Sequence, residues 1–187
     1  MTNREPQTLT NPILIDNALL IISEKLKERI TWLDTVYGKC EHHTDNDKHK
    51  KPIIYSKGRE YIDLFPDEHK ENFSFYDVED GTNITHSQLR TTISAKVNLI
   101  IYGNFEKVYG RENEQNFSIE NIKAEIDNAL KNINRSLLRL SPSKFYERPE
   151  NVYKGFSTGK VTTARTMRPF FCLRYCFDLN YTESTPC

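Results

Sequence analysis

The stretch from residue 89 to residue 102 constrains the fold more than any other part of the sequence. Apolar side chains fill every second position of its central part (Ile93, Ala95, Val97, Leu99 and Ile101), and the positions between them are mostly polar. A period of two is typical of a β-strand with one buried face. At about 3.3 Å per residue such a strand is about 45 Å long, far beyond the usual strand of about five or six residues. Its apolar face needs a covering layer.

A second long alternating stretch, residues 168–181, ends the ordered part of the sequence. Its apolar face contains Phe171, Leu173, Tyr175, Phe177, Leu179 and Tyr181. Residues 72–78 also alternate and are followed by the turn-forming residues 79–83, so we predict that they pair with 89–102 as an antiparallel hairpin. Residues 52–55 are predicted to form a further short strand.

Two amphipathic helices are predicted to cover these strands. The first has apolar residues at every third or fourth position from residue 12 to residue 33, with Asn11 as the expected N-cap and Pro12 in the first turn. The second is capped by Ser118, covers 119–133 and extends toward residue 140. The sequence therefore predicts an α+β fold: an antiparallel sheet with two long strands, covered by two amphipathic helices, with long loops and terminal arms.

A chain of 187 residues and 21.9 kDa is long enough for one domain. We predict a flexible N-terminal arm at residues 1–10, a single α+β domain at 11–181 and a C-terminal tail at 182–187. Within the domain, residues 39–51 are expected to form a mobile loop and residues 143–166 an extended loop or hairpin.

The charge balance and the cysteines restrict the classes of function. The 26 basic residues equal the 26 acidic ones, and the absence of a basic surplus argues against dedicated DNA binding. No run of about 18 apolar residues predicts a membrane span, and no signal peptide is expected. Four scattered cysteines do not make a disulfide framework, and Cys172 and Cys176 would lie about 13 Å apart on a strand, so a reducing, cytoplasmic setting is expected.

The segment 39–51 is rich in potential metal ligands. It contains Cys40, His42, His43, Asp45, Asp47 and His49. It has no Cys-x₂-Cys pair, its first two histidines are adjacent, and Lys50 stands where a calcium-binding loop needs glycine. A solvated loop is the favoured interpretation, and a metal site is the alternative.

Two other patterns are suggestive of enzymes. Asp63 and Asp67, with His69, could form an acid–base cluster, but their hydrophilic surroundings favour a solvated turn. The run from Gly155 to Lys160 lacks the spacing of a phosphate-binding loop. We therefore predict no catalytic residue, no cofactor and no metal, and a protein that is not an enzyme.

The long strands carry more apolar residues than two helices can cover. Ile100, Tyr102, Phe170, Phe156 and Tyr153 are the predicted contacts with another subunit. This apolar surplus, together with the terminal arms, favours self-assembly.

Several segments together resemble a known class of protein. They are the run Trp32-Leu33-Asp34-Thr35-Val36-Tyr37-Gly38, Pro52 with Tyr55, the pattern Tyr61-x-x-Leu64-x-Pro66, the strand 72–76, and the end of the long strand at 98–102. In combination they resemble small structural proteins of the head–tail module of tailed bacteriophages, including crAss-like phages of Bacteroides-type hosts. The order of elements is similar to the tail-terminator and tail-completion fold, in which a sheet flanked by helices closes into a ring.

The resemblance implies a structural role in the virion. The chain would be a ring subunit of the head–tail connector, or neck, bridging portal-side and tail-side rings and lining the DNA passage. It would form a homo-oligomeric ring, contact portal, adaptor and tail proteins, let DNA pass without specific binding, and assemble in the host cytoplasm. The alternatives are a small cytosolic binding module, or a metal-dependent enzyme that uses the loop with Cys40, His42, His43 and His49.

Overall fold

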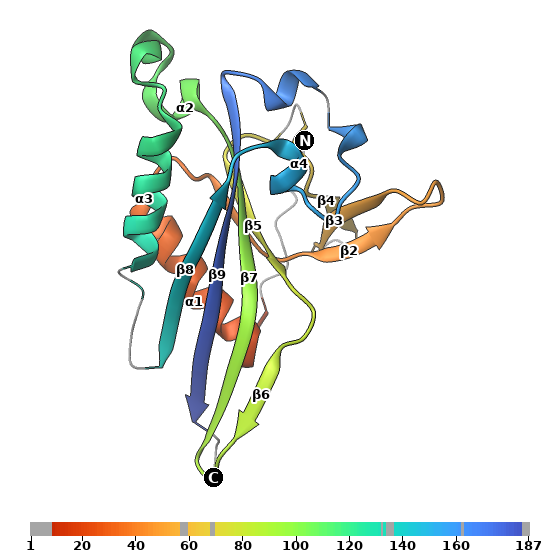
Figure 1. Cartoon of the computed structure of the whole chain (residues 1–187), viewed down its shortest axis with the longest axis vertical. Helices are drawn as coiled ribbons and strands as arrows, with labels where there is room; N and C mark the ends of the chain where they lie inside the picture. Colours follow the sequence, from red (N-terminus) through yellow and green to blue (C-terminus); the bar gives the residue numbers. More distant parts are fainter. Residues whose placement is uncertain are drawn as a thin grey trace.

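The computed structural model describes residues 9–56, 60–67, 70–131, 133, 137–161 and 163–184, and it has an α+β fold (Figure 1). The main sheet contains β1 (Thr35–Lys39), β5 (Phe73–Val78), β6 (Asn83–His86), β7 (Arg90–Asn104), β8 (Leu138–Tyr146) and β9 (Phe170–Ser184). Its strand order is β1-β5-β7-β9-β8, and β6 pairs with the outer end of β7. A separate three-stranded sheet contains β2 (Glu41–Thr44), β3 (Lys50–Tyr55) and β4 (Tyr61–Asp63).

The two predicted long strands are confirmed as the centre of the main sheet. β7 and β9 each have 15 residues and pair antiparallel along their whole length, from Arg90 opposite Ser184 to Asn104 opposite Phe170. The predicted antiparallel pairing of β5 with β7 is also confirmed. The connection between them is longer than a turn because β6 lies within it, and β1 joins β5 in parallel.

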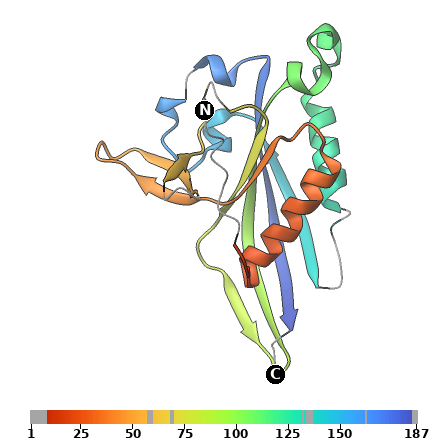
Figure 2. The same ribbon diagram turned by 180° about the vertical axis from the view of Figure 1, so that it is seen from behind.

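Two helices cover one face of this sheet, α1 (Leu14–Arg29) and α3 (Ile119–Lys131). Figure 2 shows α1 running obliquely across the strands. The core between helices and sheet buries the apolar faces predicted for β7 and β9, with Ile22, Leu26, Ile122 and Ile126 on the helix side. Both helices and both strands thus derive from apolar periodicity in the sequence.

The ends of the helices differ from the prediction. α1 begins at Leu14, whose N–H donates to Glu183 Oε2 at the end of β9 (3.1 Å), and no local side chain caps it, so the cap at Asn11 was wrong. A carboxylate from a distant strand replaces the local cap. Ser118 Oγ does accept the Asn121 N–H (3.4 Å), as predicted.

The expected extension of the second helix was also wrong. α3 ends at Lys131, and residues 138–146 form β8 on β9. Leu138 and Leu140 are buried while Arg139 and Ser141 are exposed, which is the alternation of a strand. Pairing with β9 therefore overrides the helical propensity of the leucines.

The other face of the main sheet is covered over its upper half only. The β2–β3–β4 sheet and the short helix α4 (Pro149–Val152) pack there and enclose a second apolar core (Figure 1). The mobile loop expected at 39–51 is instead largely a hairpin of β2 and β3, and the extended loop expected at 143–166 contains the end of β8, α4 and the 3-10 turns Thr158–Lys160 and Thr163–Thr166. Two short helical elements, α2 (Phe105–Tyr109) and the 3-10 helix Arg111–Asn116, connect β7 to α3.

The predicted subunit contacts lie in this second core. Ile100, Tyr102 and Tyr153 are fully buried, and Phe156 is 9% exposed. Phe170 is half-buried and stacks on Tyr102, with ring centroids 5.8 Å apart. The expectation that these residues are exposed was wrong, because the chain's own small sheet and α4 cover the surplus apolar surface.

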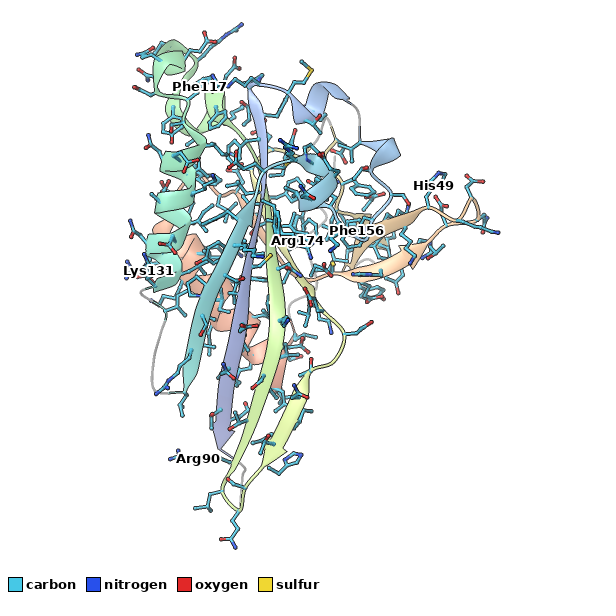
Figure 3. All side chains as sticks on the ribbon, in the orientation of Figure 1. His49, Arg90, Phe117, Lys131, Phe156 and Arg174 are labelled. Atoms are coloured by element: carbon cyan, nitrogen blue, oxygen red, sulfur yellow. The ribbon has the colours of Figure 1, made fainter. Side chains whose placement is uncertain are left out.

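The lower half of the same sheet face is open and polar. Lys96, Asp178, Asn180 and Arg139 are exposed there, and the side chains of Thr92 and Thr182 are hydrogen-bonded across β7 and β9 (3.0 Å). β6 and the adjoining end of β7 form the far tip of the molecule, marked by Arg90 in Figure 3.

Several expectations concern residues outside the described ranges. Residues 1–8 of the expected N-terminal arm and 185–187 of the expected C-terminal tail lie there, whereas residues 182–184 are the end of β9. Within the described residues, the helices are all too short or too polar to cross a membrane.

Candidate functional site

Charged and nucleophilic side chains gather where the second core meets the open half of the sheet. Asp77 of β5 and Arg174 of β9 are buried there, beside Cys40 and His42. Figure 3 shows Arg174 on the sheet and Phe156 beside it, toward the small sheet. We refer to Cys40, His42, Asp77 and Arg174 as the Asp77 cluster.

The corner at Cys40 brings the cluster together. The chain leaves the main sheet at the end of β1, and the Cys40 N–H donates to the Tyr76 carbonyl (2.8 Å). It then enters β2 of the small sheet, where His42 lies opposite Pro52. Asp77 is the next residue of β5 after Tyr76, and alternation places it on the face that carries Phe73 and Phe75. Because the chain passes from the main sheet to the small sheet at Cys40, the side chains of β2, β5 and β9 come together beside that corner.

The Asp77 carboxylate has several polar partners. Its Oδ1 lies 2.8 Å from His42 Nε2, and its Oδ2 lies 3.6 Å from Arg174 Nη2. Arg174 Nη1 also donates to the Lys154 carbonyl (3.2 Å), and the buried Asn98 donates to the Asp77 carbonyl (3.3 Å). Each buried charge thus has partners: His42 and Arg174 pair with the Asp77 carboxylate, and Asp77 and the Lys154 carbonyl pair with Arg174.

The thiols of this region are not activated nucleophiles. Burial raises the pKa of Cys40, and the Asp77 charge raises it further. Burial also raises the pKa of Cys176, although Arg174 opposes the shift. Cys40, Cys172 and Cys176 are free, so the prediction that Cys172 and Cys176 are not bridged is confirmed. A protonated, buried thiol is a poor nucleophile at neutral pH.

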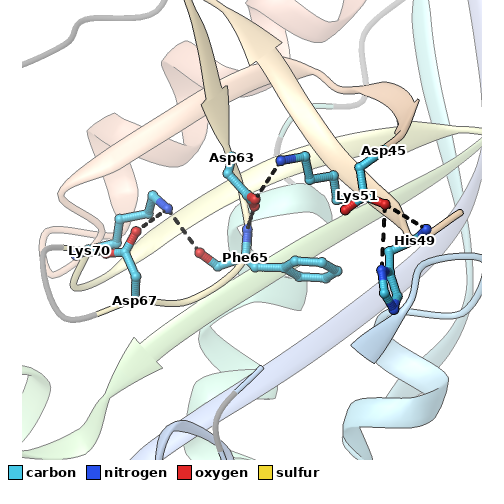
Figure 4. Close-up of polar contacts among 7 residues, drawn as sticks. All are labelled: Asp45, His49, Lys51, Asp63, Phe65, Asp67 and Lys70. Carbon is cyan, nitrogen blue, oxygen red and sulfur yellow. Dashed lines mark hydrogen bonds and ion pairs between the residues drawn. The ribbon is translucent and has the colours of Figure 1, made fainter. Parts of the chain in front are cut away.

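The structure divides the ligand-rich segment 39–51 into two groups. Cys40 and His42 join Asp77, with donor atoms within 4.8 Å of one another. His49 instead joins Asp45 and Asp47 at the tip of the β2–β3 hairpin, where its Nδ1 lies 3.5 Å from Asp45 Oδ1 (Figure 4). His43 is exposed on β2.

The carboxylates considered as an acid–base pair have local partners. Asp63 Oδ1 accepts the Phe65 N–H (2.9 Å), and its Oδ2 lies 3.4 Å from Lys51 Nζ (Figure 4). Asp67 binds Lys70 through the side-chain amine and accepts the Lys70 N–H (3.0 Å). Both carboxylates therefore stabilise a turn and surface ion pairs, and His69 lies outside the described residues.

Sequence reasoning missed Asp77 and Arg174. Each is a lone charge in an otherwise apolar part of a predicted strand. Two charges of opposite sign on strands of one sheet are a signal for a buried ion pair. The sequence contains that signal. It does not show that β5 and β9 lie on either side of β7, which is the arrangement that brings the two charges together.

No protein-family model matches the sequence, and no curated protein matches it.

Proposed function

We propose that this chain is a structural ring subunit of the head–tail connector of a tailed bacteriophage. The proposal is supported by the sequence resemblance described above and by an α+β fold with a long antiparallel sheet flanked by helices. It includes a homo-oligomeric ring that joins portal-side and tail-side rings, assembles in the host cytoplasm and functions in the virion.

The observation that carries the proposal is the exposed tip of the sheet. All four residues of β6 are exposed, and β6 is an edge strand that pairs only with β7 among the described strands. Ile84, opposite the core residue Ile93, is 50% exposed, Leu89 is 64% exposed, and neither residue belongs to the two apolar cores. Exposed apolar residues on an edge strand favour contact with another chain.

A tip that binds a different surface of the next copy gives a heterologous contact, and repeated heterologous contacts form a ring when the rotation between copies closes. In such a ring the open half of the sheet face would line the DNA passage, and its side chains suit that position. It presents hydroxyl and amide side chains with Lys96, Arg139 and Asp178. Mixed charge of this kind lets DNA slide, because a strongly basic surface would hold the phosphates.

The test is the oligomeric state of the full chain, measured by size-exclusion chromatography with light scattering and by negative-stain electron microscopy. We expect ring-shaped oligomers, and we expect the double variant Ile84→Asp, Leu89→Asp to be monomeric. The control is Ile13→Asp, which places one such charge on another exposed apolar residue (63% exposed) and should leave the rings intact. A wild-type chain that stays monomeric at high concentration overturns the proposal.

A further inference from the structure

We propose that Cys40, His42 and Asp77 form a Zn²⁺ site. The proposal does not depend on the ring, because it concerns ligands within one chain. It replaces the loop site considered from the sequence, since His43 and His49 take no part and Asp77 comes from a different strand.

The donor set fits zinc. It contains a sulfur, an imidazole nitrogen and a carboxylate oxygen, which are the three ligand types that proteins use for Zn²⁺. The three donor atoms lie within 4.8 Å of one another. A tetrahedral zinc ion with bonds of about 2.0–2.3 Å places its ligands about 3.3–3.7 Å apart. Side-chain movements of about 1 Å, which separate His42 Nε2 from Asp77 Oδ1 (2.8 Å apart) and bring more distant donor atoms closer, therefore fit the three atoms to one ion.

The Cys40 thiol supplies a second, independent argument. Cys40 is 4% exposed and Asp77 is 5% exposed, so both point into the protein. The thiol forms a hydrogen bond with the backbone of Cys40 itself. Zinc binding would replace that local contact, because the metal takes the sulfur as thiolate and the thiol proton leaves to solvent.

The surroundings hold the other two ligands in place. Arg174 pairs with Oδ2 of Asp77, and Oδ1 is the oxygen that faces His42, so the metal would replace the contact between Oδ1 and His42 Nε2. The His42 ring packs on Phe156, with ring centroids 4.6 Å apart. Partners that orient the ligands are typical of metal sites. The His42 side chain is 51% exposed, so a metal ion can reach the site from solvent.

The second group, Asp45, Asp47 and His49, has a simpler explanation. Asp45 Oδ1 accepts the N–H groups of Asp47 (3.1 Å) and His49 (2.9 Å), which is the hydrogen bonding of a tight turn. This group therefore carries no proposal and provides control positions.

The experiment is metal titration of the full chain after removal of bound metal with a chelator. We expect one equivalent of Zn²⁺ per chain by competition with a chromogenic chelator, and with Co²⁺ a thiolate-to-cobalt charge-transfer absorption. His42→Ala changes an exposed residue and leaves Asp77 paired with Arg174, and it should weaken Zn²⁺ binding by about tenfold or more. Cys40→Ala should abolish the charge-transfer absorption.

The control variants are His43→Ala on the same strand and Asp47→Asn at the hairpin tip, and both should bind Zn²⁺ as the wild type does. The proposal is overturned if the wild type binds no stoichiometric Zn²⁺, if the Co²⁺ complex lacks the charge-transfer absorption, or if His43→Ala weakens binding as much as His42→Ala. None of these outcomes bears on the ring, whose test is the size of the particle.

Discussion

Two buried tyrosines differ in how their hydroxyl groups are satisfied. The hydroxyls of Tyr76 and Ser23 are hydrogen-bonded to each other at 3.1 Å. The hydroxyl of Tyr153 is buried with no hydrogen-bond partner among the described residues, and burial raises the pKa of Tyr153 well above its usual value. An unpaired buried hydroxyl costs free energy, whereas a paired one contributes.

We therefore expect opposite results from the same substitution at the two positions. Tyr153→Phe should leave the free energy of unfolding unchanged or raise it by about 1 kcal/mol, because an unsatisfied group is removed. Tyr76→Phe should lower it by about 1 kcal/mol, because the hydrogen bond to Ser23 is lost, although Ser23 still donates to the Leu19 carbonyl. Urea denaturation of both variants is the measurement, and an equal loss in the two variants would show that the Tyr153 hydroxyl is bound.

At the scale of the element, β7 depends on one close approach at its upper end. A Cβ on Gly103 would lie 2.4 Å from Phe171 Cζ and 3.1 Å from Asn72 Oδ1. Phe171 cannot move away freely, because its ring packs on Phe105 (centroids 4.7 Å apart) and on Trp32 (5.8 Å). The absence of a side chain at this position lets β5, β7 and β9 meet.

Gly103→Ala should therefore lower the free energy of unfolding by about 1–3 kcal/mol through overpacking. Gly159→Ala is the matched control, because a Cβ there meets nothing within 4 Å, and it should change stability by less than about 0.5 kcal/mol. Thermal and urea unfolding of the two variants measure the difference. If Gly103→Ala were as stable as Gly159→Ala, the contact with Phe171 would not be a tight one.

The elements that the sequence failed to predict share a physical cause. β8 has leucines that suit a helix as well as a strand, and only the ladder to β9 decides between them. β2 is exposed at every position, so it has no apolar alternation to detect. Its pairing with β3 and the turn at Asp45 define it instead.

The stability of the whole molecule depends on pH in the alkaline range, because the chain buries thiol and tyrosine hydroxyl groups whose pKa values are raised by burial. Burial raises the pKa of Cys172 from 9.0 to about 12 and that of Tyr102 from 10.0 to about 12. Below about pH 9 these groups are protonated in both the folded and the unfolded chain, so their contribution is constant. As pH rises from about 9 to 12, the unfolded chain loses these protons first, and the free energy of unfolding falls.

We therefore expect the urea midpoint to be level between about pH 7 and pH 9 and to fall above that range. Cys172→Ala should reduce the slope above pH 9, since one of the buried groups is removed. Tyr61→Phe, at a tyrosine that is 53% exposed, is the control and should keep the wild-type slope. A midpoint that is constant up to about pH 11 would contradict the assigned burial.

The sequence by itself determined that two helices and two long strands exist, and which face each presents to the first core, but not where they end. These features are set by apolar periodicity within single segments, which is a local property. Only the tertiary structure decided what covers Ile100 and Tyr102, and that Cys40 and His42 meet Asp77 rather than His49. Such contacts join residues far apart in the chain, and they follow from one corner at Cys40, where hydrogen bonding to Tyr76 turns the chain from one sheet into the other.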